Sequence, residues 1–210
     1  MCCTKRKILD ISLRLYNKCG INNVSQRMIS KDLGISPGNL TYHFKKTEDI
    51  LEQLFLNMVE EIDVIVENGS SRDFSITDLI NLYQRVVLVL HRNKFFLIDF
   101  VHIIRHCDRI NEKYRQITEK RHLQFLQTII DLTDNGYIKP PSFPGEYKAL
   151  YERMTIISDF WMSKETIIEG SVSEESINHY MFINLAQIYP YLTEKGRDDF
   201  SASFGMYMTE

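Results

Sequence analysis

The chain has 210 residues, of which 44% are hydrophobic, and a formal net charge of −3 at pH 7. A chain of this length can bury a substantial core, in one large domain or in two smaller ones. The first residues, Met-Cys-Cys-Thr followed by charges, and the absence of an apolar run near 18 residues argue against a signal peptide and a membrane span. We therefore expect a cytoplasmic protein that has no membrane partner.

The first predicted helix extends from about Lys5 to Cys19. Gly20 ends it, and its buried face is formed by residues at 3–4 spacing, namely Ile8, Ile11, Leu15 and Cys19. This pattern indicates a helix that supports its neighbours. The basic residues at its start either reach a DNA phosphate or form a solvated tail: Lys5, Arg6 and Lys7.

Two short helices follow, and Gly34 joins them. Ser25 can cap the first helix by accepting from an unpaired backbone N–H, and Gly34 can adopt the positive φ that ends it. Ser36 is the predicted cap of the second helix, with Pro37 at its first position. This layout is typical of a helix-turn-helix that binds DNA, although all-helical proteins also contain plain hairpins of this kind.

The second short helix has one apolar and one polar face, because Leu40 and Phe44 lie four residues apart and anchor it. On the outer face, Asn39 can pair with adenine and the Thr41 methyl can contact thymine, while Gly38 lets the backbone approach the duplex. Neighbouring Tyr, His and Lys side chains suit phosphates. The predicted DNA-binding residues are Ser25, Gln26, Arg27, Ser36, Pro37, Gly38, Asn39, Thr41, Tyr42, His43, Lys45 and Lys46.

Charge is divided unevenly between the two ends of the chain. Residues 1–56 contain nine Lys and Arg against five Asp and Glu, a net charge of +4, so the remainder carries −7. A basic end attracts a polyphosphate, and an acidic body is repelled by it. This asymmetry favours DNA binding by the N-terminal end.

The first 55 or so residues resemble the TetR family of bacterial transcriptional regulators. The resemblance rests on the run from Ile8 to Gly20, on Ser25, and on Ile29-Ser30, Leu33-Gly34-Ile35-Ser36, Gly38-Asn39-Leu40-Thr41-Tyr42-His43-Phe44 and Glu48-Asp49-Ile50-Leu51. It implies a three-helix DNA-binding domain, a helical effector-binding and dimerisation domain, and repression relieved by a small molecule. Two positions depart from the family pattern: Thr41 stands where an aromatic residue is frequent, and Thr47 replaces a lysine that meets a phosphate. Lys46 can substitute for that lysine.

The rest of the chain is predicted to be helical, which makes the fold class all-α. A long helix covers about Glu48 to Glu67, and a loop with a Ser75/Asp78 cap signal follows it. No alternating strand pattern stands out. Residues 1–47 are predicted to form the DNA-binding domain and residues 48–210 the helical ligand-binding and dimerisation domain, with further helices near 76–92, 94–107, 110–135, 146–169, 174–189 and 197–208.

A ligand pocket is expected among the helices between residues 76 and 135, because cavities between helices are usual ligand sites. The candidate residues are Tyr83, Phe96, Asp99, Phe100, His102, Ile103, His106 and Phe125. On one continuous helix, Asp99, His102 and His106 would share a face. They could form a polar handle for the effector, a hydrogen-bonded network or surface stripe, or a transition-metal site. These alternatives stay open, and no metal or cofactor is predicted.

The late pair of helices, 146–169 and 174–189, is rich in apolar and aromatic residues, which either fill the core or form an interface. The resemblance implies an antiparallel four-helix contact between two copies. The predicted dimer residues are Tyr151, Met154, Ile157, Trp161, Met162, Tyr180, Ile183 and Ile188. A dimer also suits DNA reading, since one recognition helix reads only a few base pairs of a palindromic operator.

The sequence therefore predicts a homodimeric TetR-like repressor, released from its operator by an unknown effector. A DNA-binding regulator of the same fold without an effector, or an activator, is the alternative. An enzyme is not expected and no catalytic residue is assigned, since the chain lacks a nucleophile elbow, a phosphate loop and a His-Glu metal motif. The four cysteines lack C-x-x-C spacing and are expected to be reduced: Cys2, Cys3, Cys19 and Cys107.

Overall fold

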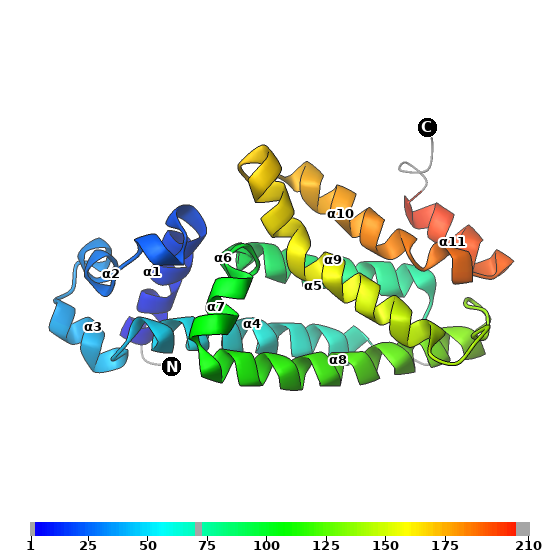
Figure 1. The fold of residues 1–210 in the computed structure, drawn as a ribbon, viewed down its shortest axis with the longest axis horizontal. Coiled ribbons are helices and arrows are strands. Elements are labelled where there is room, and N and C mark those ends of the chain that lie inside the picture. The colour runs from blue at the N-terminus through cyan, green and yellow to red at the C-terminus, as the bar shows by residue number, and fades with distance from the viewer. Residues whose placement is uncertain (1–2, 70–72, 205–210) are drawn as a thin grey trace.

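The computed structural model describes residues 3–69 and 73–204, apart from the side chain of Cys3. The molecule is elongated, with a small helical head at one end and a larger helical body (Figure 1). The described residues form helices, and their one β feature is an isolated bridge between Ile138 and Leu192. Cys2, part of the predicted loop before Ser75 and the predicted last helix beyond Phe204 lie outside the described residues. The all-α fold class is confirmed.

The head consists of α1 (Cys3–Cys19), a 3-10 turn (Ile21–Asn23), α2 (Gln26–Leu33) and α3 (Pro37–His43). Apolar side chains from all three α-helices are buried against each other and form its core: Ile8, Leu9, Tyr16, Ile29 and Leu40. Of the buried face predicted for the first helix, Ile8 is buried, whereas Ile11, Leu15 and Cys19 are half-buried. Ser25 caps α2 and Ser36 caps α3, as expected. The head is therefore a three-helix unit with the helix-turn-helix at its outer end.

α4 (Thr47–Gly69) leads from the head into the body and lies beside α8 (Asp108–Asp134) (Figure 1). α5 (Ile76–Arg92) returns along α4. It begins with the predicted cap, in which the Ser75 hydroxyl accepts from the Asp78 N–H and the Asp78 carboxylate accepts from the Ser75 N–H. This reciprocal pair satisfies two otherwise unpaired donors at the start of α5.

The helix predicted over 94–107 is two helices, α6 (Lys94–Ile98) and α7 (Phe100–His106), and the single-helix prediction is wrong. The chain turns at Asp99, which has φ −96° and ψ 19°. The Ser163 hydroxyl of α9 donates to the carbonyl oxygens of Leu97 (2.7 Å) and Ile98 (3.2 Å). These bonds satisfy carbonyl groups that the break removes from the helical ladder.

The body is completed by α9 (Glu146–Glu169), α10 (Glu174–Ala186) and α11 (Glu194–Phe204). α9 has the predicted bounds, and Ser173 caps α10 as expected. α10 ends earlier than predicted, before a 3-10 turn (Tyr189–Tyr191) that contains Pro190. No helix in the described ranges is long and apolar enough to cross a membrane.

Candidate nucleic-acid interface

The helix-turn-helix has the geometry that its sequence predicts. The Ser25 hydroxyl accepts from the Met28 N–H at 3.3 Å, and the Ser36 hydroxyl accepts from the Asn39 N–H at 3.2 Å. Gly34 lies in the left-handed region with φ 71°, which ends α2 and starts the turn. Gln26 donates from its side-chain nitrogen to the Phe44 carbonyl at 3.2 Å, so α2 also holds the end of α3.

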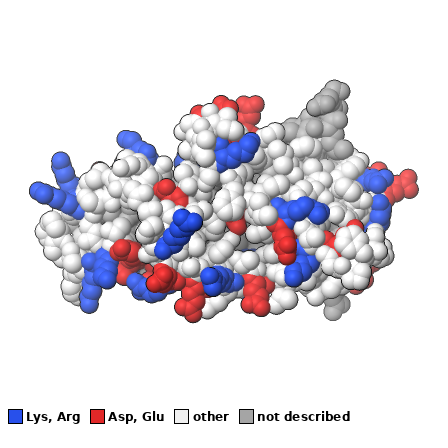
Figure 2. All heavy atoms as spheres, in the orientation of Figure 1, with Lys and Arg blue, Asp and Glu red and all other residues white. Residues whose placement is uncertain are grey.

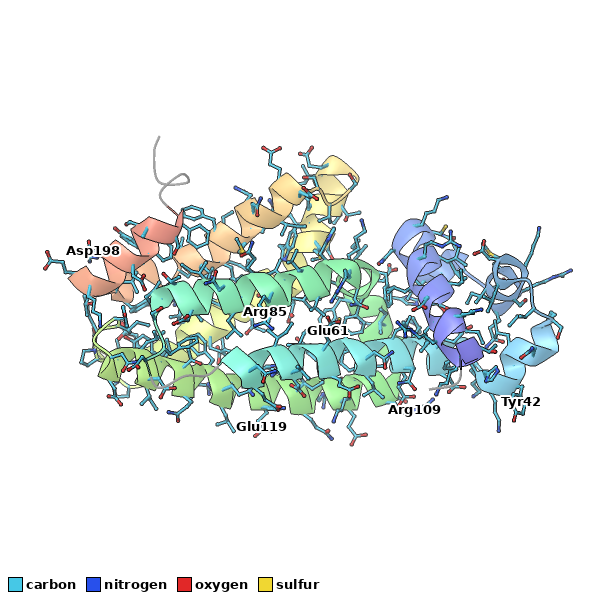
Figure 3. The ribbon with its side chains drawn as sticks, turned by 180° about the vertical axis from the view of Figure 1, so that it is seen from behind. Tyr42, Glu61, Arg85, Arg109, Glu119 and Asp198 are labelled. Atoms are coloured by element: carbon cyan, nitrogen blue, oxygen red, sulfur yellow. The ribbon has the colours of Figure 1, made fainter. Side chains whose placement is uncertain are left out.

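α3 presents the predicted face to solvent. Leu40 and Phe44 are buried, whereas Asn39 and Thr41 are exposed and Tyr42 is 84% exposed. Tyr42 projects from the outer end of the head (Figure 3). The Thr41 hydroxyl donates to the Pro37 carbonyl at 2.9 Å, which leaves its methyl group as the part available to a base. This face combines a hydrogen-bonding amide, a methyl group and an aromatic hydroxyl.

The other predicted DNA-binding residues surround this face. Ser25, Arg27, Lys45 and Lys46 are exposed, while Gln26 and His43 are half-buried. Lys and Arg side chains project from the outer end of the head, whereas the body carries both Lys and Arg and Asp and Glu side chains (Figure 2). The outer end of the head is therefore basic, which suits a surface that meets phosphates.

Two side chains, Asn17 and Asp99, join the head to the body. The sequence did not predict this role for either of them. The Asn17 amide donates to the Arg92 carbonyl at 2.8 Å and accepts from the Phe95 N–H at 3.0 Å. The Asp99 carboxylate, predicted to face a ligand pocket, accepts instead from the Ile21 N–H at 3.1 Å. Asn17 and Asp99 thus hold the head against the corner between α5 and α6.

A second connection lies between the start of α4 and the start of α8. Arg109 contacts Asp49 at 2.8 Å and Glu52 at 2.7 Å, and the Lys46 N–H donates to Asp49 at 3.0 Å (Figure 3). The hydrogen bond from Arg109, together with that from Lys46, lowers the pKa of Asp49. Farther along α4, Asp63 pairs with Lys120 and Arg121. Although burial acts to raise the pKa of Asp63, the two cations lower it overall.

The predicted pocket residues do not gather around one cavity. Phe96, Phe100 and Ile103 are buried in the core, and Tyr83 hydrogen-bonds to Ser158 and Asn184. The rings of Phe125 and Tyr151 are 5.4 Å apart. His102 and His106 are exposed and stacked on each other with centroids 4.2 Å apart, while Asp99 faces the head. The shared polar face predicted for the three residues required a continuous helix, which the break at Asp99 removes.

No group of His, Cys, Asp and Glu among the described residues has the arrangement of a metal site.

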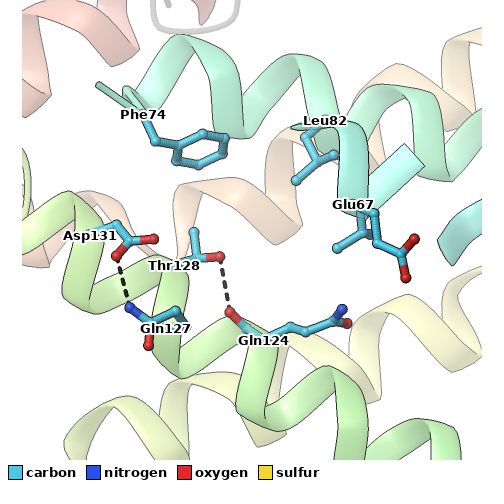
Figure 4. A pocket seen from close by; sticks show the side chains of 8 residues that line it. Glu67, Phe74, Leu82, Gln124, Gln127, Thr128 and Asp131 are labelled. Atoms are coloured by element: carbon cyan, nitrogen blue, oxygen red, sulfur yellow. Dashed lines mark hydrogen bonds between the residues drawn. The ribbon is translucent and has the colours of Figure 1, made fainter. Parts of the chain in front are cut away.

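A cavity of about 310 Å³ lies elsewhere, between the end of α4, the first half of α5 with the residue Phe74 before it, and the C-terminal half of α8. Figure 4 shows Phe74 and Leu82 on one side and the α8 side chains on the other. The described residues that line it are Val66, Glu67, Phe74, Leu82, Gln124, Gln127, Thr128 and Asp131. None of them belongs to the predicted pocket, because the position of this cavity depends on how three distant segments pack.

The predicted dimer residues divide between core and partial exposure. Trp161, Met162, Tyr180 and Ile188 are buried within their own chain, so they fill the core and offer no surface to a partner. Half-buried positions are Tyr151, Met154, Ile157 and Ile183. The exposed apolar side chains of α9 are instead Ile156 (61%), Phe160 (41%), Ile167 (82%) and Ile168 (60%).

Comparison with known families gives two adjoining matches. The profile described as "Bacterial regulatory proteins, tetR family" matches residues 8–54, and the one described as "Bacterial transcriptional repressor" matches residues 57–200. The HTH-type transcriptional regulator AcrR of Shigella flexneri is 33% identical over 52 residues, which span 25% of this chain and 24% of that protein. The alignment thus covers about a quarter of this curated relative.

Solved structures resemble the whole chain. A TetR-family transcriptional regulator from Marinobacter aquaeolei VT8 has a TM-score of 0.88 and 25% identity, covering 98% of this chain and 99% of that one. A putative transcriptional regulator from Saccharomonospora viridis, solved in complex with choline, has a TM-score of 0.68 and 17% identity. That alignment covers 91% of this chain and 98% of the Saccharomonospora protein. The second likeness concerns the fold alone.

Proposed function

Because the chain belongs to the TetR family of bacterial transcriptional regulators, we propose that it is a homodimeric repressor that binds a palindromic operator in the cytoplasm and is released by a small effector. Its family and fold are those of regulators rather than of enzymes. In this proposal residues 1–47 read DNA and residues 48–210 bind the effector and dimerise. α4, which begins at Thr47, joins the two parts.

The exposed face of α3 is the observation that carries the DNA-binding part of the proposal. Leu40 and Phe44 anchor the helix, and Gln26 fixes its end, so Asn39, Thr41 and Tyr42 are presented on a rigid support. Rigid presentation favours binding because little conformational freedom is lost on association. We assign Asn39 to base reading and Tyr42 to a phosphate.

Recognition of a palindromic operator also requires a two-fold dimer, and the exposed apolar side chains of α9 suit such a contact. Ile156, Phe160 and Ile167 lie at spacings of four and seven residues, hence on one face of α9, and all are exposed in the single chain. A self-complementary apolar patch of this kind suits a two-fold dimer contact. We propose this face of α9, in place of the buried residues predicted earlier, as the centre of the interface.

Release requires that the effector bind one conformation better than another. The Asn17 and Asp99 contacts link the head to the α5–α6 corner, and the Arg109 ion pairs link α4 to α8. A ligand that favours a different position of α4 would move both heads out of register with the half-sites. A coupling of about 1–3 kcal/mol would weaken operator binding about 5- to 150-fold.

The DNA-binding assignment is tested by selecting duplexes from genomic fragments and measuring their affinity by fluorescence anisotropy at several salt concentrations. We expect salt-sensitive binding to a two-fold symmetric sequence. Asn39→Ala should reduce discrimination against a substituted adenine by about tenfold, because a bidentate contact is lost. Tyr42→Phe should weaken all duplexes by a similar factor, since a phosphate contact carries no base information.

Asn178→Ala, an exposed asparagine on α10, is the matched control and should leave DNA binding unchanged. If Asn39→Ala kept the base preference of the parent, the assignment of Asn39 to base reading would be wrong. The absence of salt-sensitive retention for every genomic duplex would contradict the function as a whole.

A further inference from the structure

We propose that the cavity between α4, α5 and α8 binds a small organic cation, an amine with an apolar body, and that this cation is the effector. The inference rests on the proposed function, since it names the ligand class of that regulator. The cavity, at about 310 Å³, lies at the lower end of the size range of small-molecule sites. It therefore suits a compact ligand rather than a cofactor of nucleotide size.

One wall of the cavity is apolar. Phe74 is buried, and Leu82 and Val66 lie beside it, so an aromatic or aliphatic group placed here would lose contact with water. Leu82 also lies close to Gly69, where an added Cβ would be 2.6 Å from the Leu82 Cδ1 atom. Leu82 therefore packs against the end of α4.

The opposite wall is polar and acidic. On this wall α8 contributes Gln124, Gln127, Thr128 and Asp131, whereas Glu67, in the last turn of α4, lies across the cavity near Leu82 (Figure 4). Among the described lining residues there are two carboxylates and no Lys, Arg or His. The charge of these described lining residues favours a cation over an anion, and the Lys120 ammonium, which lies 3.8 Å from Glu67, is outside this lining.

The hydrogen bonds already made by these carboxylates leave room for a charged donor. Asp131 accepts from the neutral side-chain amide of Gln127 at 2.8 Å, within the same helix. The Lys120 ammonium lies 3.8 Å from Glu67, at the outer limit of an ion pair, and 3.1 Å from Asp63. An ammonium group would form a charge-assisted hydrogen bond with Asp131 or with Glu67, and such a bond is stronger than one between neutral groups.

The location of the cavity connects the ligand to the head. Val66 and Glu67 lie near the end of α4, and Thr47 at its beginning follows the reading helix after a short turn. A helix of 23 residues extends roughly 33 Å, so a small tilt at one end becomes a larger displacement at the other. A cation bound in this cavity therefore acts on the element that positions α3.

Isothermal titration calorimetry on the full chain tests the ligand class, with 2-phenylethylamine, benzylamine and 1,6-diaminohexane as probes. 2-Phenylethanol and phenylacetate serve as the neutral and anionic counterparts of the first probe. We expect at least one amine to bind with Kd below about 1 mM and both counterparts to bind at least tenfold more weakly. At least one of Asp131→Asn and Glu67→Gln should weaken the amine about tenfold, and Glu119→Gln, an exposed position on α8, should not.

Three results would overturn the inference: binding of no amine below about 10 mM, equal binding of amine and phenylacetate, or amine affinities unchanged in both cavity variants. Thermal unfolding without ligand verifies that the variants are folded. Operator affinity is measured separately with and without the amine, and a bound amine that leaves it unchanged would also reject the effector role. A chain that binds the amine but retains no duplex would contradict the proposed function while leaving the cation site intact.

Discussion

Asp159, on the body helix α9, is a carboxyl group with an unusual environment. It is half-buried, and the Tyr114 hydroxyl of α8 donates to its Oδ2 atom at 2.5 Å. Burial raises its pKa to about 6, although the bond from Tyr114 acts in the opposite direction. Since the folded chain holds this proton more tightly than the unfolded chain does, protonation of Asp159 favours folding. The contribution is complete below about pH 4 and is lost as the pH rises through about 6.

The change in the free energy of unfolding caused by Asp159→Asn should therefore be more favourable at pH 8 than at pH 4.5. The amide is neutral at both pH values and its oxygen can still accept from Tyr114, so the variant avoids the ionised, half-buried carboxylate. We expect the difference in the free energy of unfolding, variant minus parent, to increase by about 2 kcal/mol between pH 4.5 and pH 8. Urea denaturation followed by circular dichroism measures it. Asp198→Asn is the control for loss of an exposed carboxylate, and an equal pH effect in both variants would contradict the assignment.

At the level of single residues, the sequence predicts local roles well and distant ones poorly. The caps at Ser25, Ser36 and Ser75 involve neighbours within three residues, and all three form as predicted. Asp99 was misassigned because its partner, the Ile21 N–H, is 78 residues away. The role of Asn17 was missed for the same reason, since no local pattern shows that its helix will meet the α5–α6 corner.

Among the secondary structure elements, helices with clear end signals were predicted closely. α9 begins and ends at the expected residues because Gly145 and Gly170, both at positive φ, bound it. The break between α6 and α7 was not predicted, since the apolar spacing through Phe96, Phe100 and Ile103 continues across it. It is stabilised by Ser163, whose approach depends on the packing of α9.

The connection before α11 depends on close contact between two loops. The Lys139 N–H donates to the Tyr191 carbonyl at 2.9 Å, and the Thr193 N–H donates to the Tyr137 carbonyl at 3.0 Å. Gly196, in the first turn of α11, lies against this pair of segments. A Cβ atom added to it would be 2.2 Å from the Tyr137 carbonyl oxygen, a backbone atom that cannot rotate away.

Gly196→Ala should therefore lower the free energy of unfolding by about 2–3 kcal/mol, as expected for overpacking against backbone. Chemical denaturation of the full chain measures this difference. Gly38→Ala is the matched control, because nothing lies within 4 Å of its added Cβ and its φ is not positive. We expect the control to stay within about 0.5 kcal/mol of the parent. Equal free energies of unfolding for the two alanine variants would contradict this prediction, because they would show that the two loops can move apart without loss of stability.

Over the whole molecule, the helices form a small head and a larger body, while the assignment of DNA binding to residues 1–47 and of ligand binding and dimerisation to residues 48–210 stays a prediction. Apolar residues are distributed around α9 because it packs on α6, α8 and α10, so more than one of its faces is apolar. Trp161 and Ile167 therefore look alike in sequence. The first is buried and the second is 82% exposed.

Ile167→Glu should disrupt the dimer without unfolding the chain, because its side chain makes little contact within the monomer. Light scattering after size-exclusion chromatography should give a mass of 24.8 kDa for the variant and about twice that for the parent. Val64→Glu, a 51% exposed apolar position on α4, is the control and should remain dimeric. A dimeric Ile167→Glu variant would exclude this face of α9 as the contact.

The paired hydrogen bonds of Asn17 have a consequence for protein engineering. They involve the Arg92 carbonyl and the Phe95 N–H, which any residue at position 92 and any residue except proline at position 95 would supply. These two groups come together where the chain turns between α5 and α6. A chimera that grafts a foreign reading head onto this body should preserve signalling only if the graft retains an asparagine at this position. In this chain, exchange of the head would then depend on this amide together with the Asp99 contact to the Ile21 N–H.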